Sequence, residues 1–195
     1  MNFSIGEKTF DHYKDFISIS NDASKKIIND SYIYVGYGVK DINHDDYKEI
    51  DVKGKLVVAI AGEPKDSNGN YIISGTRKNS KWSNKRQSLS VKQNLAKEMG
   101  AAAFILVDNT LFKMYSNYYK EKDKNESESD LSLNVNVKPF YSFISGDRLG
   151  NFLTKSHNGI FNKNIIIDFE STSVPVVSKN VVALIPGSQK PNEYI

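Results

Sequence analysis

The feature that most constrains the fold of this chain is a pair of short, continuously apolar segments with an amphipathic segment between them. Leu56–Ala61 and Ala101–Val107 have the length and composition of strands that are buried on both faces. Ser83–Met99 predicts a helix, and Gly100 stands where a left-handed residue commonly ends one. A strand, a helix and a strand in this order form a crossover, so we expect the two strands to be parallel neighbours.

The predicted helix has one apolar face. Val91, Leu95 and Met99 recur every four residues, and Leu89 and Ala96 lie beside them. This period places the five side chains along one stripe, which we expect to pack against the sheet.

Several further segments indicate strands around this crossover. Tyr32–Val39 is aromatic and β-branched but is broken by Gly36 and Gly38, which we expect to allow tight turns. Asn134–Ile144 alternates and contains Pro139, which favours an edge strand. A short strand at Tyr71–Ile73 and a closing strand at Ile165–Phe169 complete the predicted set.

Two other segments lie outside the strands. Lys120–Asp130 consists almost entirely of charged and small polar residues, so we expect a mobile loop there. Ser145–Lys155 reads as a short helix with Ser145 as its N-cap.

Composition excludes several classes of site and partner. The chain has 195 residues, no cysteine and a formal net charge of +3. Thiolate zinc sites, disulfides and cysteine nucleophiles are therefore excluded, and the charge is too small to indicate a nucleic-acid partner. No apolar run approaches the roughly 18 residues of a membrane span, and the N-terminus lacks the pattern of a signal peptide.

The sequence offers weak candidates for metal binding. Asp41, Asn43 and Asp45 have the spacing of the first three ligands in a calcium loop, but Asp46 and Val52 stand where that loop needs Gly and Glu. The pattern therefore favours a surface turn. The three histidines, which we expect to be solvated, lack the spacing of a zinc site: His12, His44 and His157. We therefore predict no catalytic or metal-ligating residue in this chain.

The most basic stretch, Arg77–Arg86, contains the only tryptophan, Trp82. A cationic groove with a stacking aromatic is typical of single-strand nucleic-acid binding, but one aromatic gives little support for it. The simpler interpretation is a loop entering a helix, with Trp82 as a hydrophobic staple. A third interpretation is that Arg77 and Trp82 contact a peptide or a neighbouring domain.

The order of the motifs resembles the protease-associated domain over about Ser31 to Glu170. The resemblance is carried by segments of the strands and turns and of the two predicted helices: Tyr34–Gly38, Asp45–Tyr47, Asp51–Val58, Lys92–Val107 and Lys138–Leu149. This resemblance implies an α/β fold of the swivelling β/β/α type, an open β-barrel or sandwich with two flanking helices.

The C-terminal residues resemble the entry into the catalytic domain of a di-zinc aminopeptidase, in the family that includes the glutamate carboxypeptidase relatives. The matching residues are Asn180–Ala183, Pro186-Gly187 and Glu193–Ile195. In that family a His-x-Asp pair with the first zinc ligands follows almost at once. The resemblance therefore implies a chain truncated before those ligands, with a lead-in at 1–30, a protease-associated domain at 31–170 and the start of the peptidase domain at 171–195.

The resemblance implies a noncatalytic accessory domain that borders the active-site cleft and influences substrate access or protein contacts. Its implied partners are the catalytic domain of the same parent chain and peptide substrates. Zinc would belong to the parent peptidase domain, and the implied location is extracellular or in the cell envelope. Two alternatives stay open: a free-standing peptide- or protein-binding module of the same fold, and an unrelated small α/β enzyme.

Overall fold

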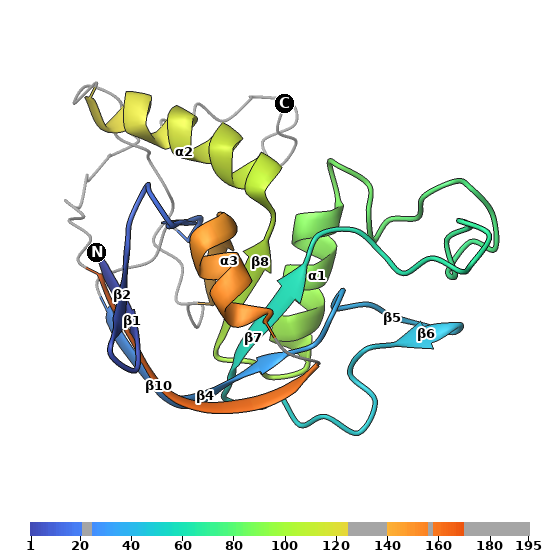
Figure 1. Cartoon of the computed structure of the whole chain (residues 1–195), viewed down its shortest axis with the longest axis horizontal. Helices are drawn as coiled ribbons and strands as arrows, with labels where there is room; N and C mark the ends of the chain where they lie inside the picture. The colour runs from blue at the N-terminus through green and yellow to red at the C-terminus, as the bar shows by residue number, and fades with distance from the viewer. Residues whose placement is uncertain (21–24, 125–139, 156–157, 170–195) are drawn as a thin grey trace, which may run out of the picture.

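The computed structural model describes residues 1–20, 25–124, 140–155 and 158–169, which form a mixed α/β domain. Eight strands of these residues make one curved sheet that nearly closes into a barrel (Figure 1). Their spatial order is β2 (Lys8–Asp11), β1 (Asn2–Ile5), β10 (Gly159–Phe169), β4 (Lys25–Tyr34), β7 (Leu56–Ile60), β8 (Ala103–Val107), β9 (Tyr141–Ser145) and β3 (Phe16–Ser18).

The centre of the sheet is parallel and its two flanks are antiparallel. β4, β7, β8 and β9 run parallel to one another, whereas β1, β2, β10 and β3 pair antiparallel with their neighbours. Leu56 lies opposite Ala103 and Ile60 opposite Val107, so the predicted parallel pairing of these two segments is confirmed. Both strands are buried because helices or other strands cover each face of the sheet.

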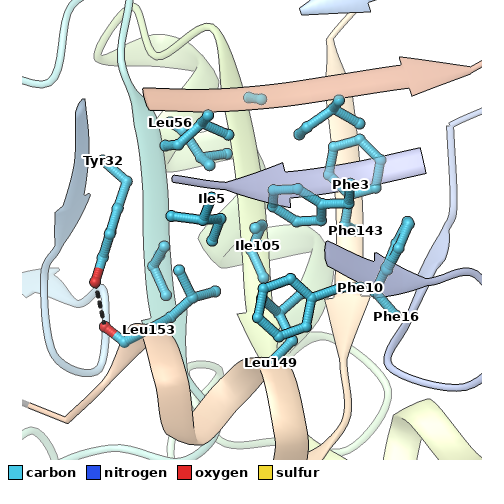
Figure 2. Close-up of a cluster of buried hydrophobic side chains, with 14 of the residues drawn as sticks. Phe3, Ile5, Phe10, Phe16, Tyr32, Leu56, Ile105, Phe143, Leu149 and Leu153 are labelled. Atoms are coloured by element: carbon cyan, nitrogen blue, oxygen red, sulfur yellow. Dashed lines mark hydrogen bonds between the residues drawn. The ribbon is translucent and has the colours of Figure 1, made fainter. Parts of the chain in front are cut away.

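Alternate residues of the central strands enter two separate cores. Leu56 and Val58 join a large cluster inside the curve of the sheet, whereas Val57 and Ala59 face a second cluster on the outer side. Figure 2 shows the inner cluster, where Phe3 makes an edge contact with Phe16 at a centroid distance of 5.3 Å. This two-residue period is that of strands buried on both faces.

Helix α1 (Ser88–Glu98) covers the outer face of β7 and β8. It ends in a Schellman motif, because the N–H groups of Gly100 and Ala101 donate to the carbonyls of Lys97 and Ala96. Gly100 has φ +84°, which confirms its predicted left-handed conformation. The predicted helix start at Ser83 is wrong. The predicted stripe is confirmed for four residues that pack in the outer cluster: Leu89, Leu95, Ala96 and Met99. The buried residues of α1 are Lys92 and Ala96, and the burial of Lys92 was not predicted.

A further helix, α2 (Asn109–Lys124), directly follows β8. With α1 and α3 (Asp147–Leu153), it gives three helices in the described residues instead of the two expected. The side chain of Asp108 caps its start by accepting from the N–H groups of Thr110 and Leu111. The prediction of a loop beginning at Lys120 is therefore wrong up to Lys124, and its remaining part, 125–130, lies outside the described residues.

Helix α3 (Asp147–Leu153) lies inside the curve of the sheet. Leu149 and Leu153 pack in the inner core, and the hydroxyl of Tyr32 donates to the carbonyl of Leu153 at 3.2 Å (Figure 2). The N-cap position is Gly146, because Ser145 is still the last residue of β9; the predicted cap at Ser145 is wrong.

Strand β9 is not an edge strand, contrary to prediction, because β3 from the N-terminal region pairs with its outer side. The connection from β2 to β3 then brings the two edges of the sheet together. Within it, buried Asp15 accepts from the N–H of Asp11 at 2.8 Å and pairs with Arg148. β1 to β3, from the segment expected to be a lead-in, belong to the same sheet as β4, within which residue 31 lies.

Three of the predicted strands differ from the observed ones. The strand predicted at Tyr32–Val39 ends at Tyr34, and Gly36 and Gly38 then turn the chain with φ +69° and +66°, as expected. The closing strand is longer than predicted, and Tyr71–Ile73 forms isolated bridges at Tyr71 only. Residues 134–139 and 171–195 and His157 lie outside the described residues. None of the described helices combines the length and apolarity needed to cross a membrane.

Candidate functional site

Two irregular segments project together from the carboxyl ends of β4 and β7. We call them the lobe: residues 36–50, which contain the small hairpin of β5 (Lys40–Asp41) and β6 (His44–Asp45), and residues 61–87, between β7 and α1. Figure 1 shows both segments extending beyond α1, away from the curved sheet. Ligands of α/β sheets commonly bind outside the carboxyl ends of parallel strands. The position of the lobe therefore makes it the candidate site.

Glu63 fixes the base of the longer segment. Its side chain is buried, with 3% exposed, although glutamate is rarely buried without partners. One carboxylate oxygen accepts the N–H of Ser80 at 2.7 Å and the hydroxyl of Ser83, and the other accepts the hydroxyl of Ser80 at 2.7 Å. Residues 63 and 80–83 are thereby held together across the loop that separates them.

Trp82 joins the two segments of the lobe. Its indole is 3% exposed, and its Nε1–H donates to Oδ2 of Asp41 at 3.0 Å. This hydrogen bond lowers the pKa of Asp41, with a smaller contribution from Lys81. The indole therefore supports the lobe from inside and is not presented to a partner. It is also no helix staple, because α1 begins only at Ser88.

Arg77, by contrast, is exposed on the longer segment. The other exposed cations there are Lys65, Lys78, Lys81, Lys85 and Arg86. The two acidic residues of this segment have partners within it. Glu63 points inward. Asp66 accepts from the N–H groups of Asn68 and Asn70, which lowers the pKa of its carboxyl group. The outer surface of residues 61–87 is consequently cationic.

The candidate calcium spacing falls on the hairpin, where the interpretation as a turn is confirmed. Asp41 is bonded to Trp82, and Asp45 accepts the N–H of Tyr47 at 2.8 Å. At the tip of the same hairpin, Ile42 is 94% exposed. The carboxylates thus hold the turn in shape, and an apolar side chain is presented outward.

Lys92, near the lobe, is a lysine whose side chain is unexpectedly buried. It is fully buried on α1, and its ammonium group donates to the carbonyls of Ile60 at 2.9 Å and Gly62 at 2.6 Å. Burial lowers its pKa to about 8, against the opposing effect of nearby Asp46, Glu63 and Asp108. A lysine with a lowered pKa can be a catalytic group, but an enclosed ammonium bonded to two carbonyls has no access to a substrate. Lys92 instead fixes the root of the longer segment.

The histidines are placed apart from each other. His12 lies against Tyr13 at a ring-centroid distance of 3.9 Å, and Nε2 of His44 is 2.8 Å from Oδ1 of Asp46. Both rings are half-buried with partners, so the expectation of solvated histidines is wrong for these two. Across the described residues, no three His, Asp or Glu side chains are grouped as metal ligands.

The sequence pointed to the basic stretch but not to the residues that organise it. Glu63 gave no local signal, since its partners Ser80 and Ser83 are distant in the chain. A lysine beside Ala96 on an apolar helix face was the one available sign that Lys92 is buried. No protein-family model, curated protein or solved structure matches this chain.

Proposed function

We propose that this chain is a noncatalytic, protease-associated domain of a zinc-dependent aminopeptidase, and that the lobe is its contact surface for protein. The family part of the proposal rests on the order of the sequence motifs and on Asn180–Ala183 with the residues that follow. The binding part rests on one observation: a long irregular segment is held in a single conformation by buried polar groups.

The length and internal anchoring of residues 61–87 support a binding role. A connection from a strand to the helix that crosses back needs only a few residues, and longer loops held on a rigid scaffold are commonly functional. Glu63 and Trp82 are buried beneath this loop. Because they order it before a partner arrives, less conformational entropy is lost on binding.

The charge of the lobe indicates the chemistry of its partner. The exposed cations of residues 61–87, together with the exposed Ile42, fit a protein surface with acidic residues around an apolar side chain. In the proposed parent, the first such partner is the peptidase domain of the same polypeptide, and peptide substrates approaching its cleft are the second. The zinc ligands would belong to that domain, and the location would be extracellular or in the cell envelope.

The second candidate function is a free-standing peptide- or protein-binding module of the same fold. The same observation on the lobe supports it. The two candidates differ in what the gene encodes after Ile195, because the aminopeptidase proposal requires a His-x-Asp pair shortly downstream.

A fluorogenic aminoacyl assay, with and without chelator, tests the proposal on this chain and on a protein extended through the downstream reading frame. The short chain should be inactive and should retain no stoichiometric zinc after dialysis, whereas the extended protein should show chelator-sensitive turnover. Turnover by the short chain would overturn the accessory role. An extended protein that is inactive but binds peptides would favour the free-standing module.

Charge reversal tests the contact surface separately. Arg77→Glu with Lys78→Glu should change the substrate preference or rate of the extended enzyme without changing its zinc content. Lys113→Glu with Lys120→Glu, at two exposed positions of α2, is the matched control. Equal effects of the lobe and control variants would contradict a contact role for the lobe.

A further inference from the structure

A second basic surface lies away from the lobe, where α3 meets the edge strand β2. It surrounds an open pocket of about 200 Å³, which we call the basic pocket. The pocket is lined by Lys8, Phe10, Arg148, Asn151, Phe152 and Lys155. Strand and helix supply these residues together, so the walls belong to the regular scaffold of the domain.

Cations gather around the two phenyl rings of this pocket. Nζ of Lys8 and Nζ of Lys163, from β10, each lie 5.1 Å from the ring centroid of Phe152. The guanidinium carbon of Arg148 lies 5.1 Å from the centroid of Phe10. Each cation is attracted to the face of a ring, which holds it near the pocket.

Only one of these cations has a carboxylate partner among the described residues. Arg148 pairs with buried Asp15 and donates to the carbonyl of Thr9 at 3.2 Å. Within the described residues, Lys8, Lys155 and Lys163 have no carboxylate oxygen within 4.0 Å. Among the described residues, these three ammonium groups therefore carry positive charge that no carboxylate within 4.0 Å compensates.

We propose that the basic pocket binds a compact, doubly charged oxyanion of the phosphate type, held by the ammonium groups of Lys8 and Lys155, which line it, and of Lys163, which lies beside the lining residue Phe152. Clefts lined by one sign of charge over an apolar floor concentrate the electrostatic potential, and here the rings of Phe10 and Phe152 form that floor. Lysine ammonium groups bind phosphate as point charges, and the pocket volume suits a single anionic group.

A peptide added to the edge of the sheet is a poorer occupant. The outer edge of β2 already has partners, since the carbonyl of Thr9 accepts from Arg148 and the N–H of Asp11 donates to Asp15. These groups cannot pair with an incoming strand without losing those bonds. The pocket therefore favours a small anion or the anionic end of a larger molecule.

Titration of the whole chain with inorganic phosphate, followed by amide NMR shifts, tests the proposal. The shifts should saturate and concentrate at residues 8–10, 148–155 and 163. Lys8→Met combined with Lys163→Met should weaken binding about tenfold, because each lost charge contact contributes up to about fivefold. Lys8→Arg should keep most of the affinity, and Lys113→Met combined with Lys120→Met, at two exposed positions of α2, is the control for net charge. Circular dichroism of each variant checks that it is folded.

Further measurements identify the source of the anion or overturn the site. Tighter binding of phenyl phosphate than of inorganic phosphate would identify a phosphate ester as the source of the group, whereas equal binding would identify the free ion. Equal binding of acetate, or equal loss of affinity when Lys113→Met is combined with Lys120→Met, would overturn the site in favour of a general cationic field. Shifts confined to residues 61–87 would overturn it as well, without bearing on the proposed protein-contact role of the lobe.

Discussion

Replacing Lys92 by Met should abolish the rise in the free energy of unfolding that this lysine causes between the folded pKa of about 8 and the unfolded pKa of 10.5. Burial lowers the pKa of this ammonium group from 10.5 to about 8, so the folded chain releases the proton more readily than the unfolded chain. Below that folded value both states are protonated, and keeping the buried charge costs about 3 kcal/mol.

Between the folded pKa of about 8 and the unfolded pKa of 10.5, the unfolded chain binds a proton that the folded chain does not. The free energy of unfolding therefore rises with pH through this window. Raising the pH from about 7 to about 9.5 should stabilise the wild-type chain by about 2 kcal/mol through this group alone. Because burial raises the pKa of Tyr32 to about 12, that tyrosine stays protonated over the same range.

Urea unfolding of the wild type and Lys92→Met at the two pH values isolates the effect, since all other groups cancel in the difference. The fluorescence of Trp82, the only tryptophan, reports unfolding in both proteins. The stability difference between them should change by about 2 kcal/mol in favour of the wild type as the pH rises. Lys97→Met, at an exposed position of the same helix, controls for the methionine. If the difference in stability between the wild type and Lys92→Met does not change with pH, the proposal that Lys92 carries a buried charge is refuted.

Other substitutions test the lobe and the packing of the helices. Trp82→Phe removes the hydrogen bond to Asp41 and should destabilise the chain by about 1–2 kcal/mol, measured by thermal circular dichroism; an unchanged melting temperature would mean that the bond does not order the lobe. Gly150→Ala should destabilise by about 1–3 kcal/mol, because the new Cβ would overlap Cγ1 of Val107; a neutral result in the same assay would show that β8 can shift away from α3. Gly100→Ala should reduce the free energy of unfolding in urea by about 1 kcal/mol through its φ of +84°, and a gain in stability would contradict the left-handed helix end.

The central crossover was predictable because its signals are local. The apolar runs of β7 and β8 and the glycine that ends α1 each depend on residues adjacent in the sequence. Helix α2 also had such a signal in Asp108, which caps it, followed by apolar residues at helical spacing. The helix was not predicted, because its aromatic residues are also typical of a strand and its charged end is also typical of a loop.

The rest depended on contacts between distant residues. β3 prevents β9 from being an edge strand, yet nothing in either segment specifies the other as its partner. Within the candidate site, Glu63 reads as a loop residue until Ser80 and Ser83 are brought to it. Trp82 similarly reads as a helix staple or as a contact for a peptide until Asp41 supplies its acceptor. Sequence reasoning could locate the basic stretch but not the side chains that shape it.

The N-terminal strands impose an order of events on folding. β1 pairs at once with β2, but β1 reaches β10 and β3 reaches β9 only when the chain has been synthesised up to residues 168 and 145. At ribosomal rates this delay is roughly ten to thirty seconds. During that interval Phe3 and Phe16, fully buried in the finished domain, lack their native partners β10 and β9. Sheets that join the two ends of a chain close slowly, since the entropy of the long loop must be overcome first. The nascent chain should therefore depend on chaperones more than a domain whose strands pair in sequence order.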